Sequence, residues 1–474
     1  MAFFAIGFLS GLPQASACSM PLLASQELEI PFTGDTRVHL TGRLDRGAIQ
    51  HEGDGIVRLE LELRGLADPS ASRVRLGTDM IVVLDRSGSM EGGKIEHARR
   101  AVRELIDQLT ARDRFALVAY SDQATLLIPL SGVETRSKER WREIAAAVTV
   151  DGYTNLSGGL DLARQALEHS KIRNPASRVI LISDGLANRG DTSHEGLMAR
   201  ARHFKQTATN LTAIGVGLDF NEVLMSSLAD TGLGNFYYVD DSEQLAEIFT
   251  QEFDASRTTI AQSLVIEIDA APGVEVVDAG GYPITRQGDT FRFHPGNLSS
   301  GQTRSVWVTF KVPSGHLGDT SPGRVRASYL HADPSSSTLE SQLAWSPLPA
   351  VACVNDEAQY LAAFNPSTWA RAVQEETFNK LRQDVAKDVR EGQRAEAIEK
   401  IAAFKKHHAS VNATLNSSEV EEVLQQTGDL ENDVEQAFQG SAAEQSYRQN
   451  VLSKEKMATA LDGRRKGSKQ KQDP

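Results

Sequence analysis

Residues 81–90 read IVVLDRSGSM. The four aliphatic residues at the start predict a strand buried on both faces, and the turn at 91–94 leads into an amphipathic helix. Asp85, Ser87 and Ser89 therefore lie at the mouth of a buried strand, where side chains two positions apart can converge. One carboxylate and two hydroxyls are hard oxygen ligands, which suit Mg²⁺, Mn²⁺ or Ca²⁺ better than zinc. The stretch predicts a site for a divalent cation.

This pattern also has a simpler interpretation, which is a turn that caps the following helix. Asp and Ser are common turn and N-cap residues, and D-x-S-x-S arises by chance in roughly one chain in ten. Two later segments favour the metal site. Thr154 lies in a loop that reads DGYTNL, and Asp184 follows the predicted strand Val179–Ser183, whose first four residues are apolar. Because the carboxyl ends of neighbouring parallel strands share one crevice, Asp85 and Asp184 are expected to meet there.

Together these segments resemble the metal-ion-dependent adhesion site of von Willebrand factor A domains. In that family D-x-S-x-S is followed by a threonine in a loop and then by an aspartate after a strand. The resemblance covers about residues 77–254 and holds in order, spacing and secondary-structure context. It implies that Ser87 and Ser89 coordinate the cation through their hydroxyls, as Thr154 does in the ligand-competent state. Asp85 and Asp184 would bind the cation directly or through water.

The resemblance also implies a function. Only two carboxylates face a doubly charged ion, so the site is nearly neutral and can still attract an outside anion. Mg²⁺ takes six near-octahedral oxygen ligands, and one of these positions can be left to water or to an Asp or Glu of a partner protein. The implied activity is capture of a carboxylate, and no catalysis is expected. Bacterial exported proteins with an A domain inside a β-sandwich, some labelled as calcium-activated chloride channel homologues, are similar. Because Met90 is followed by Glu91 and Gly92, a second ion beside the first is not expected.

An enzymatic alternative comes from residues 88–94, which read GSMEGGK and match G-x-x-x-x-G-K, most of a phosphate-binding loop. The next position in such a loop is a Ser or Thr that holds the Mg²⁺ of the nucleotide, but here it is Ile95. We therefore interpret the glycines as a flexible turn. His407 and His408 lie on a polar helix face and are expected to be solvated.

The chain has 474 residues, which is too many for one core and predicts about three domains. Its hydrophobic content of 40% and charged content of 24% are ordinary for a soluble globular protein. The formal net charge of −13 argues against a general nucleic-acid binder.

The N-terminus predicts an export signal. Residues 1–12 form an apolar run too short to span a bilayer, and Ala15-Ser16-Ala17 matches a cleavage site. The usual Lys or Arg ahead of the apolar run is missing, so either the signal is atypical or the recorded start is late. The predicted location is the bacterial periplasm, cell envelope or exterior.

The chain has two cysteines, and they allow two exclusive interpretations. In an exported chain, Cys18 and Cys353 most simply form a disulfide. Cys18 also follows the predicted cleavage site, where bacterial lipoproteins carry a lipidated cysteine, although their usual leucine three residues earlier is Ala15 here. Lipidation would anchor the protein to a membrane and leave Cys353 as a lone thiol.

Strand patterns lie on both sides of residues 77–254. Before them, apolar and polar residues alternate from Val57 to Arg64, and after them the alternation returns from Leu264 and from Val306. Short alternating strands predict an antiparallel sandwich, and we infer that the α/β domain is inserted into it. The alternative of two independent β pieces is weaker, because residues 25–76 alone could bury little core.

Within 77–254 strands and helices alternate, which predicts a doubly wound parallel sheet with the metal at its carboxyl edge. From about Asn365 the pattern becomes helical, with an apolar stripe that starts at Phe378. The predicted organisation is a signal peptide at 1–17, a β segment at 18–76, the A-type domain at 77–254, the sandwich at 255–350, a helical region at 351–445 and a disordered polar and basic tail at 446–474.

Two function classes follow. The first is a metal-dependent binding protein of the cell envelope that captures an acidic side chain of a partner. The second is a structural or assembly scaffold that acts through its helical region, with the metal only stabilising the α/β domain.

Overall fold

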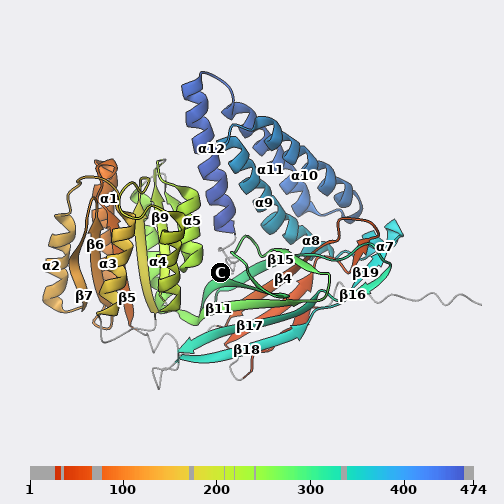
Figure 1. Cartoon of the computed structure of the whole chain (residues 1–474), viewed down its shortest axis with the longest axis horizontal. Helices are drawn as coiled ribbons and strands as arrows, with labels where there is room; N and C mark the ends of the chain where they lie inside the picture. The colour runs from red at the N-terminus through yellow and green to blue at the C-terminus, as the bar shows by residue number, and fades with distance from the viewer. Residues whose placement is uncertain are drawn as a thin grey trace, which may run out of the picture.

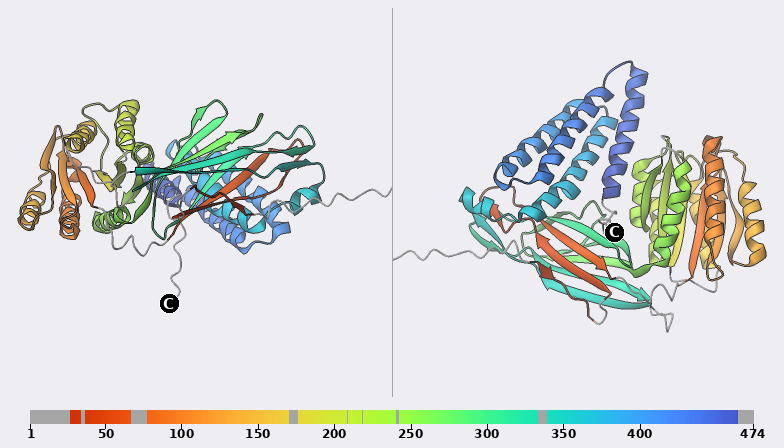
Figure 2. Two further views of the ribbon diagram at one scale, coloured as in Figure 1. Left: turned by 90° about the horizontal axis from the view of Figure 1, so that it is seen from below. Right: turned by 180° about the vertical axis from the view of Figure 1, so that it is seen from behind.

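The computed structural model describes residues 27–33, 37–66, 77–169, 176–207, 209–217, 219–239, 242–332 and 339–463. An α/β domain lies at one end of the molecule, beside a β-sandwich that carries a group of helices (Figure 1). The view from behind in Figure 2 keeps this arrangement. The predicted signal peptide at 1–17 and Cys18 lie outside the described residues.

The α/β domain contains a six-stranded sheet with the order β10-β9-β8-β5-β6-β7. Five strands are parallel, and β7 at the edge runs antiparallel to β6. The predicted parallel sheet is confirmed, with one antiparallel strand that the sequence did not predict. The strands are β5 (Thr78–Asp85), β6 (Arg114–Tyr120), β7 (Ala124–Gly132), β8 (Ala176–Ser183), β9 (Asn210–Val216) and β10 (Leu233–Val239).

Helices cover both faces of this sheet. Every residue of β5 is buried, and its side chains alternate between two cores. Met80 and Val82 pack in one core and Ile81 and Val83 in the other, which explains the continuous apolar run. The first core takes residues from α1 (Gly93–Gln108), α2 (Thr135–Ala146) and α6 (Leu245–Arg257). The second takes residues from α3 (Leu156–Glu168), α4 (His194–Gln206) and α5 (Glu222–Thr231).

The sandwich combines strands from both sides of the α/β domain. One sheet has the order β1-β2-β4-β15-β12 and the other β13-β14-β11-β17-β18. The first comprises β1 (Leu28–Glu29), β2 (Val38–Leu44), β4 (Ile56–Gly65), β12 (Glu275–Asp278) and β15 (Thr303–Lys311). The second comprises β11 (Thr259–Ala270), β13 (Thr285–Gln287), β14 (Thr290–Ser299), β17 (Gly323–Ala332) and β18 (Leu339–Pro347).

The pairing of β4 with β15 places the α/β domain as an insertion. These strands are antiparallel, with Ile56 opposite Lys311 and Arg64 opposite Thr303. A strand that precedes the α/β domain therefore pairs with one that follows it. The inward residues of both sheets form one core that includes Leu59, Ile266 and Phe293.

A small third sheet corrects the predicted start of the helical region at residue 351. Strand β19 (Val351–Val354) lies between β16 (Gly318–Thr320) and β3 (Ala48–Gln50). Cys353 lies in β19, where its thiol is buried and 3.4 Å from the carbonyl oxygen of Ser314. Cys18 is not described, so its pairing stays a prediction.

The helical region begins after β19, and the apolar stripe that starts at Phe378 is buried in its core. Gly392 adopts φ +77°, which ends α9 and lets the chain turn back. His408 is buried between aromatic rings, so the expectation that both histidines are solvated is wrong for it. The elements are α7 (Glu357–Ala362), α8 (Pro366–Arg371), the π-helical turn η4 (Ala372–Thr377), α9 (Phe378–Arg390), α10 (Arg394–Leu415), α11 (Ser418–Ala437) and α12 (Ala442–Gly463).

Helix α12 contradicts the predicted disordered tail from residue 446 as far as residue 463. It packs against α9 and reaches the α/β domain, where Lys454 Nζ donates to the carbonyl oxygen of Phe220 at 2.8 Å. Glu222, two residues further on, pairs with Arg390 of α9. The helical region thus contacts the α/β domain directly. None of the described helices is both long and apolar enough to cross a membrane.

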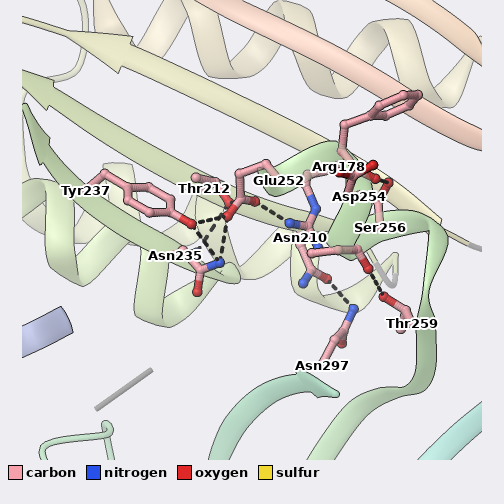
Figure 3. A network of polar contacts seen from close by, with 12 residues as sticks. Arg178, Asn210, Thr212, Asn235, Tyr237, Glu252, Asp254, Ser256, Thr259 and Asn297 are labelled. Carbon is pink, nitrogen blue, oxygen red and sulfur yellow. Dashed lines mark hydrogen bonds and ion pairs between the residues drawn. The ribbon is translucent and has the colours of Figure 1, made fainter. Parts of the chain in front are cut away.

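A polar network lies where the α/β domain meets the sandwich (Figure 3). Glu252 of α6 pairs with Arg178 of β8, and its carboxylate accepts hydrogen bonds from side chains of β9 and β10. Asn297 of β14 donates to Asn210 of β9 at 3.1 Å. These contacts attach the last helix of the α/β domain to its sheet, and that sheet to the sandwich.

Candidate metal centre

The two predicted carboxylate ligands lie together at the carboxyl edge of the parallel sheet. Asp85 is the last residue of β5, and Asp184 directly follows β8, which is the neighbour of β5 in the sheet. Both residues are fully buried. Sheet topology therefore brings together two positions that are 99 residues apart in the sequence.

The loop after β5 directs its two serines toward these carboxylates. The Ser87 amide donates to Asp85 Oδ1 at 2.9 Å, and the two serine hydroxyls are 3.1 Å apart. Ser89 Oγ donates to Asp184 Oδ1 at 2.6 Å. Met90 is fully buried and anchors the end of the loop in the core. Asp85, Ser87, Ser89 and Asp184 thus form one continuous polar cluster.

Thr154 comes from a second loop that packs on the first. Gly88 N donates to the carbonyl oxygen of Gly152 at 3.1 Å, which joins the two loops. A methyl group placed on Gly185 would lie 3.3 Å from Ser89 Oγ and 3.7 Å from Thr154 Oγ1. The two hydroxyls therefore border the same small space, and all five predicted ligands surround one region.

The donor set fits a hard divalent cation. It consists of two carboxylates and three hydroxyls, all oxygen ligands of the kind that Mg²⁺ and Ca²⁺ prefer. Burial raises the pKa of Asp85 to about 6, because its charge has been taken out of water. Among the described residues, its oxygens accept from two neutral groups, the Ser87 amide and the Ser183 hydroxyl. A cation beside Asp85 would stabilise this buried charge.

Lys94 also belongs to the cluster, and the sequence did not place it there. It lies in the first turn of α1, and its Nζ is 2.6 Å from Asp184 Oδ2 and 3.3 Å from the carbonyl oxygen of Ser89. In the sequence, Lys94 matches only the lysine of an incomplete phosphate-binding loop. Ile95 is buried in the core of the domain, so that position has a packing role.

Two apolar side chains are exposed in the loops that carry the site. Tyr153, beside Thr154, is 54% exposed, and Leu186, two residues after Asp184, is 57% exposed. The guanidinium of Arg189 stacks on the Tyr153 ring at 4.3 Å from its centroid. The candidate site thus combines predicted ligands, all of them buried except the exposed Ser89, with an exposed rim that is partly apolar and partly basic.

This fold and sequence define a known class of domain. Residues 79–251 match the von Willebrand factor type A domain family. The chain therefore contains a von Willebrand factor type A domain, called the A domain below, which corresponds to the α/β domain of the structure.

Particular relatives match parts of the chain. It is 26% identical over 220 residues to the uncharacterized protein YfbK of Escherichia coli (strain K12), which covers 45% of this chain and 37% of YfbK. It is 31% identical over 183 residues to inter-alpha-trypsin inhibitor heavy chain H4 of Homo sapiens, which covers 37% of this chain and 20% of that protein. The match thus spans well under half of either relative.

A solved structure resembles nearly the whole chain. It is described as a von Willebrand factor type A protein from Catenulispora acidiphila, with a TM-score of 0.65 and 15% sequence identity. The similarity covers 91% of this chain and 98% of that one. The fold is therefore shared well beyond the A domain.

Proposed function

We propose that this protein is a metal-dependent binding protein that captures an acidic side chain of a partner protein. The cation, Mg²⁺ or else Mn²⁺ or Ca²⁺, is held by Asp85, Ser87, Ser89, Thr154 and Asp184. The observation that carries the proposal is the convergence of these five side chains at one sheet edge, where a single hydrogen-bonded cluster joins four of them.

The five proposed ligands are arranged in a way that suits the binding of an outside carboxylate. Five protein ligands leave one of the six positions of Mg²⁺ for water or for an outside carboxylate. The cation supplies the charge that attracts this carboxylate, and the protein residues hold the cation at the surface edge of the sheet. Tyr153 and Leu186 then offer apolar contacts beside the captured side chain. A role in binding, without catalysis, accounts for each of these features.

We also propose that the protein acts outside the cytoplasm, in the bacterial periplasm, the cell envelope or the exterior. The support is the apolar N-terminal run followed by Ala15-Ser16-Ala17. Anchoring through a lipidated Cys18 is the alternative to a Cys18–Cys353 disulfide. Mass spectrometry of the mature protein separates the two, because lipidation adds acyl mass and a disulfide removes two hydrogens.

The binding proposal is tested by capture from an envelope extract with the full chain as bait. We expect partners to be recovered in Mg²⁺ and lost in EDTA or with Asp85→Ala. Asp151→Ala is the matched control, because Asp151 lies in a loop of the same edge but its side chain is 69% exposed. Recovery of the same partners with Asp85→Ala and in EDTA would show that the metal site does not capture them.

A scaffold that acts through the helical region is the second candidate. The observation in its favour is the contact of α12 with the A domain through Lys454, whose side chain is 6% exposed. In this case partners would be captured without metal, and removal of α12 surface residues such as the exposed Tyr447 would release them.

A further inference from the structure

Lys94 makes an ion pair with one of the proposed metal ligands. Its Nζ lies 2.6 Å from Asp184 Oδ2, and this pair joins a lysine side chain that is 28% exposed to a carboxylate that is fully buried. The same ammonium donates to the carbonyl oxygen of Ser89 at 3.3 Å. Lys94 therefore reaches the buried carboxylate from the solvent side of the cluster.

The end of the Lys94 side chain is also confined by the loop after β9. Gly217 adopts φ +73°, and a methyl group placed on it would lie 3.4 Å from Lys94 Cε and 3.5 Å from Nζ. The ammonium thus lies beside Gly217 as well as beside Asp184. The first turn of α1 and the loops after β8 and β9 thus come together at this contact.

The two carboxylates of the site consequently have different partners. Asp85 accepts from the Ser87 amide and the Ser183 hydroxyl, which are neutral. Asp184 accepts from the Ser89 hydroxyl through one oxygen and from the Lys94 ammonium through the other. A divalent cation therefore meets a cluster whose formal charge is −1, where two carboxylates alone would give −2.

We propose that Lys94 competes with the divalent cation for Asp184 and thereby lowers the metal affinity of the site. This inference rests on the proposed metal site. Without metal, the ammonium compensates the buried charge of Asp184, which would otherwise lie uncompensated. When metal binds, Lys94 either leaves Asp184 or remains as a like charge a few ångströms from the cation, and both lower the affinity. Loading of the site then depends on the free metal concentration.

The test is a calorimetric titration of the full chain with Mg²⁺ and Mn²⁺ after removal of bound metal. Lys94→Met removes the charge and keeps a side chain of similar length. It should bind either metal at least about tenfold more tightly than the parent chain, as expected when a neighbouring like charge is removed. Lys94→Arg keeps the charge and should stay within about threefold of the parent.

Lys380→Met is the matched control, because this lysine also pairs with an aspartate but lies in α9 of the helical region with its side chain 57% exposed. It should leave metal affinity unchanged. Circular dichroism checks the fold, and Lys94→Gln supplies the same neutral comparison should the Met variant not fold.

The titration distinguishes a failure of the proposed Lys94 competition from a failure of the proposed metal site. If Lys94→Met binds metal no more tightly than the parent, the competition is wrong and the metal site stands. If neither chain binds Mg²⁺ or Mn²⁺ at millimolar concentration, the metal site itself is wrong and the competition falls with it.

Discussion

Glu252 of α6 and Arg178 of β8 form a buried ion pair at the end of the A domain that faces the sandwich (Figure 3). Burial alone raises the pKa of Glu252, but Arg178 and the hydrogen-bond donors Asn235, Thr212 and Tyr237 outweigh it, so the pKa lies below its ordinary value. Since α6 continues into β11 of the sandwich, this pair fixes the helix that links the two domains.

Arg178→Met should destabilise the A domain strongly. The substitution leaves the Glu252 carboxylate buried without its cation, and the loss of one partner of a buried pair costs about 3–5 kcal/mol. Arg164→Met is the control, since Arg164 pairs with Glu168 on an exposed helix face and should change stability by less than about 0.5 kcal/mol. Scanning calorimetry of the two variants measures the difference. Equal melting temperatures would mean that the buried pair adds nothing.

Acid should destabilise the helical region through His408. Burial lowers the pKa of His408 to about 3, and the nearby positive charges of His407, Arg58 and Arg46 lower it in the same direction. A histidine in the unfolded chain has a pKa of about 6.5. The contribution of neutral His408 is therefore fully present above pH ~6.5 and is lost as pH falls toward ~3, because the unfolded chain binds the proton first. At pH 4.5 the loss is about 2–3 kcal/mol.

His408→Gln should flatten this pH dependence. Urea unfolding at pH 7 and pH 4.5 gives the change for each chain, and the variant should lose about 2 kcal/mol less than the parent between the two conditions. His169→Gln, at an exposed position after α3, should behave as the parent does. If both variants match the parent, protonation of His408 is not part of the acid response.

Lys454→Ala should loosen α12 from the A domain. Lys454 is buried, donates to the Phe220 carbonyl and lies over its ring at 4.3 Å, so its removal leaves that carbonyl without this donor. The rate of amide hydrogen exchange should rise at least about tenfold in α12 and in residues 219–222. Lys456→Ala is the matched control on the same helix, because Lys456 pairs with Asp433 inside the helical region. Similar exchange in both variants would contradict the proposed docking role.

The meeting of Asp85 and Asp184 was predictable from the sequence because both residues follow strands. Asp85 and Asp184 each end a continuous apolar run, and parallel strands must place such ends at one edge. Lys94 could not be placed in the same way. Its contact depends on the direction of α1 and on the path of the loop at Gly217, which are tertiary features. The glycine-lysine spacing instead suggested a nucleotide site that Ile95 excluded.

Outside the site, elements with weak apolar patterns were missed. Strand β7 lies at the sheet edge with only Ile128 buried, so it lacks the run that marks its neighbours. Helix α12 mixes Ala with Lys, Gln, Ser and Glu, yet it buries Ser453 and Lys454 against other elements. Polar residues that become buried through tertiary contacts give no periodic signal along the chain. The insertion of the A domain was predictable, because the strands on both sides share a clear two-residue period.

Gly185→Ala should weaken metal binding while the fold is retained. A methyl group at this position would lie 3.3 Å from Ser89 Oγ and 3.7 Å from Thr154 Oγ1, inside the space that those hydroxyls border. The contact with Ser89 is tight, so the hydroxyl must move by a few tenths of an ångström, and a metal ligand that moves binds less well. Affinity for Mn²⁺, measured by calorimetry, should fall about tenfold or more.

Gly132→Ala is the control for this substitution, since a methyl group on Gly132 meets nothing within 4 Å. It should bind Mn²⁺ as the parent chain does. Circular dichroism of the Gly185 variant should match the parent, because its added methyl contacts only side-chain hydroxyls within that distance. Unchanged Mn²⁺ affinity in Gly185→Ala would place the cation away from the Ser89 and Thr154 hydroxyls, and the ligand set would then have to be reassigned.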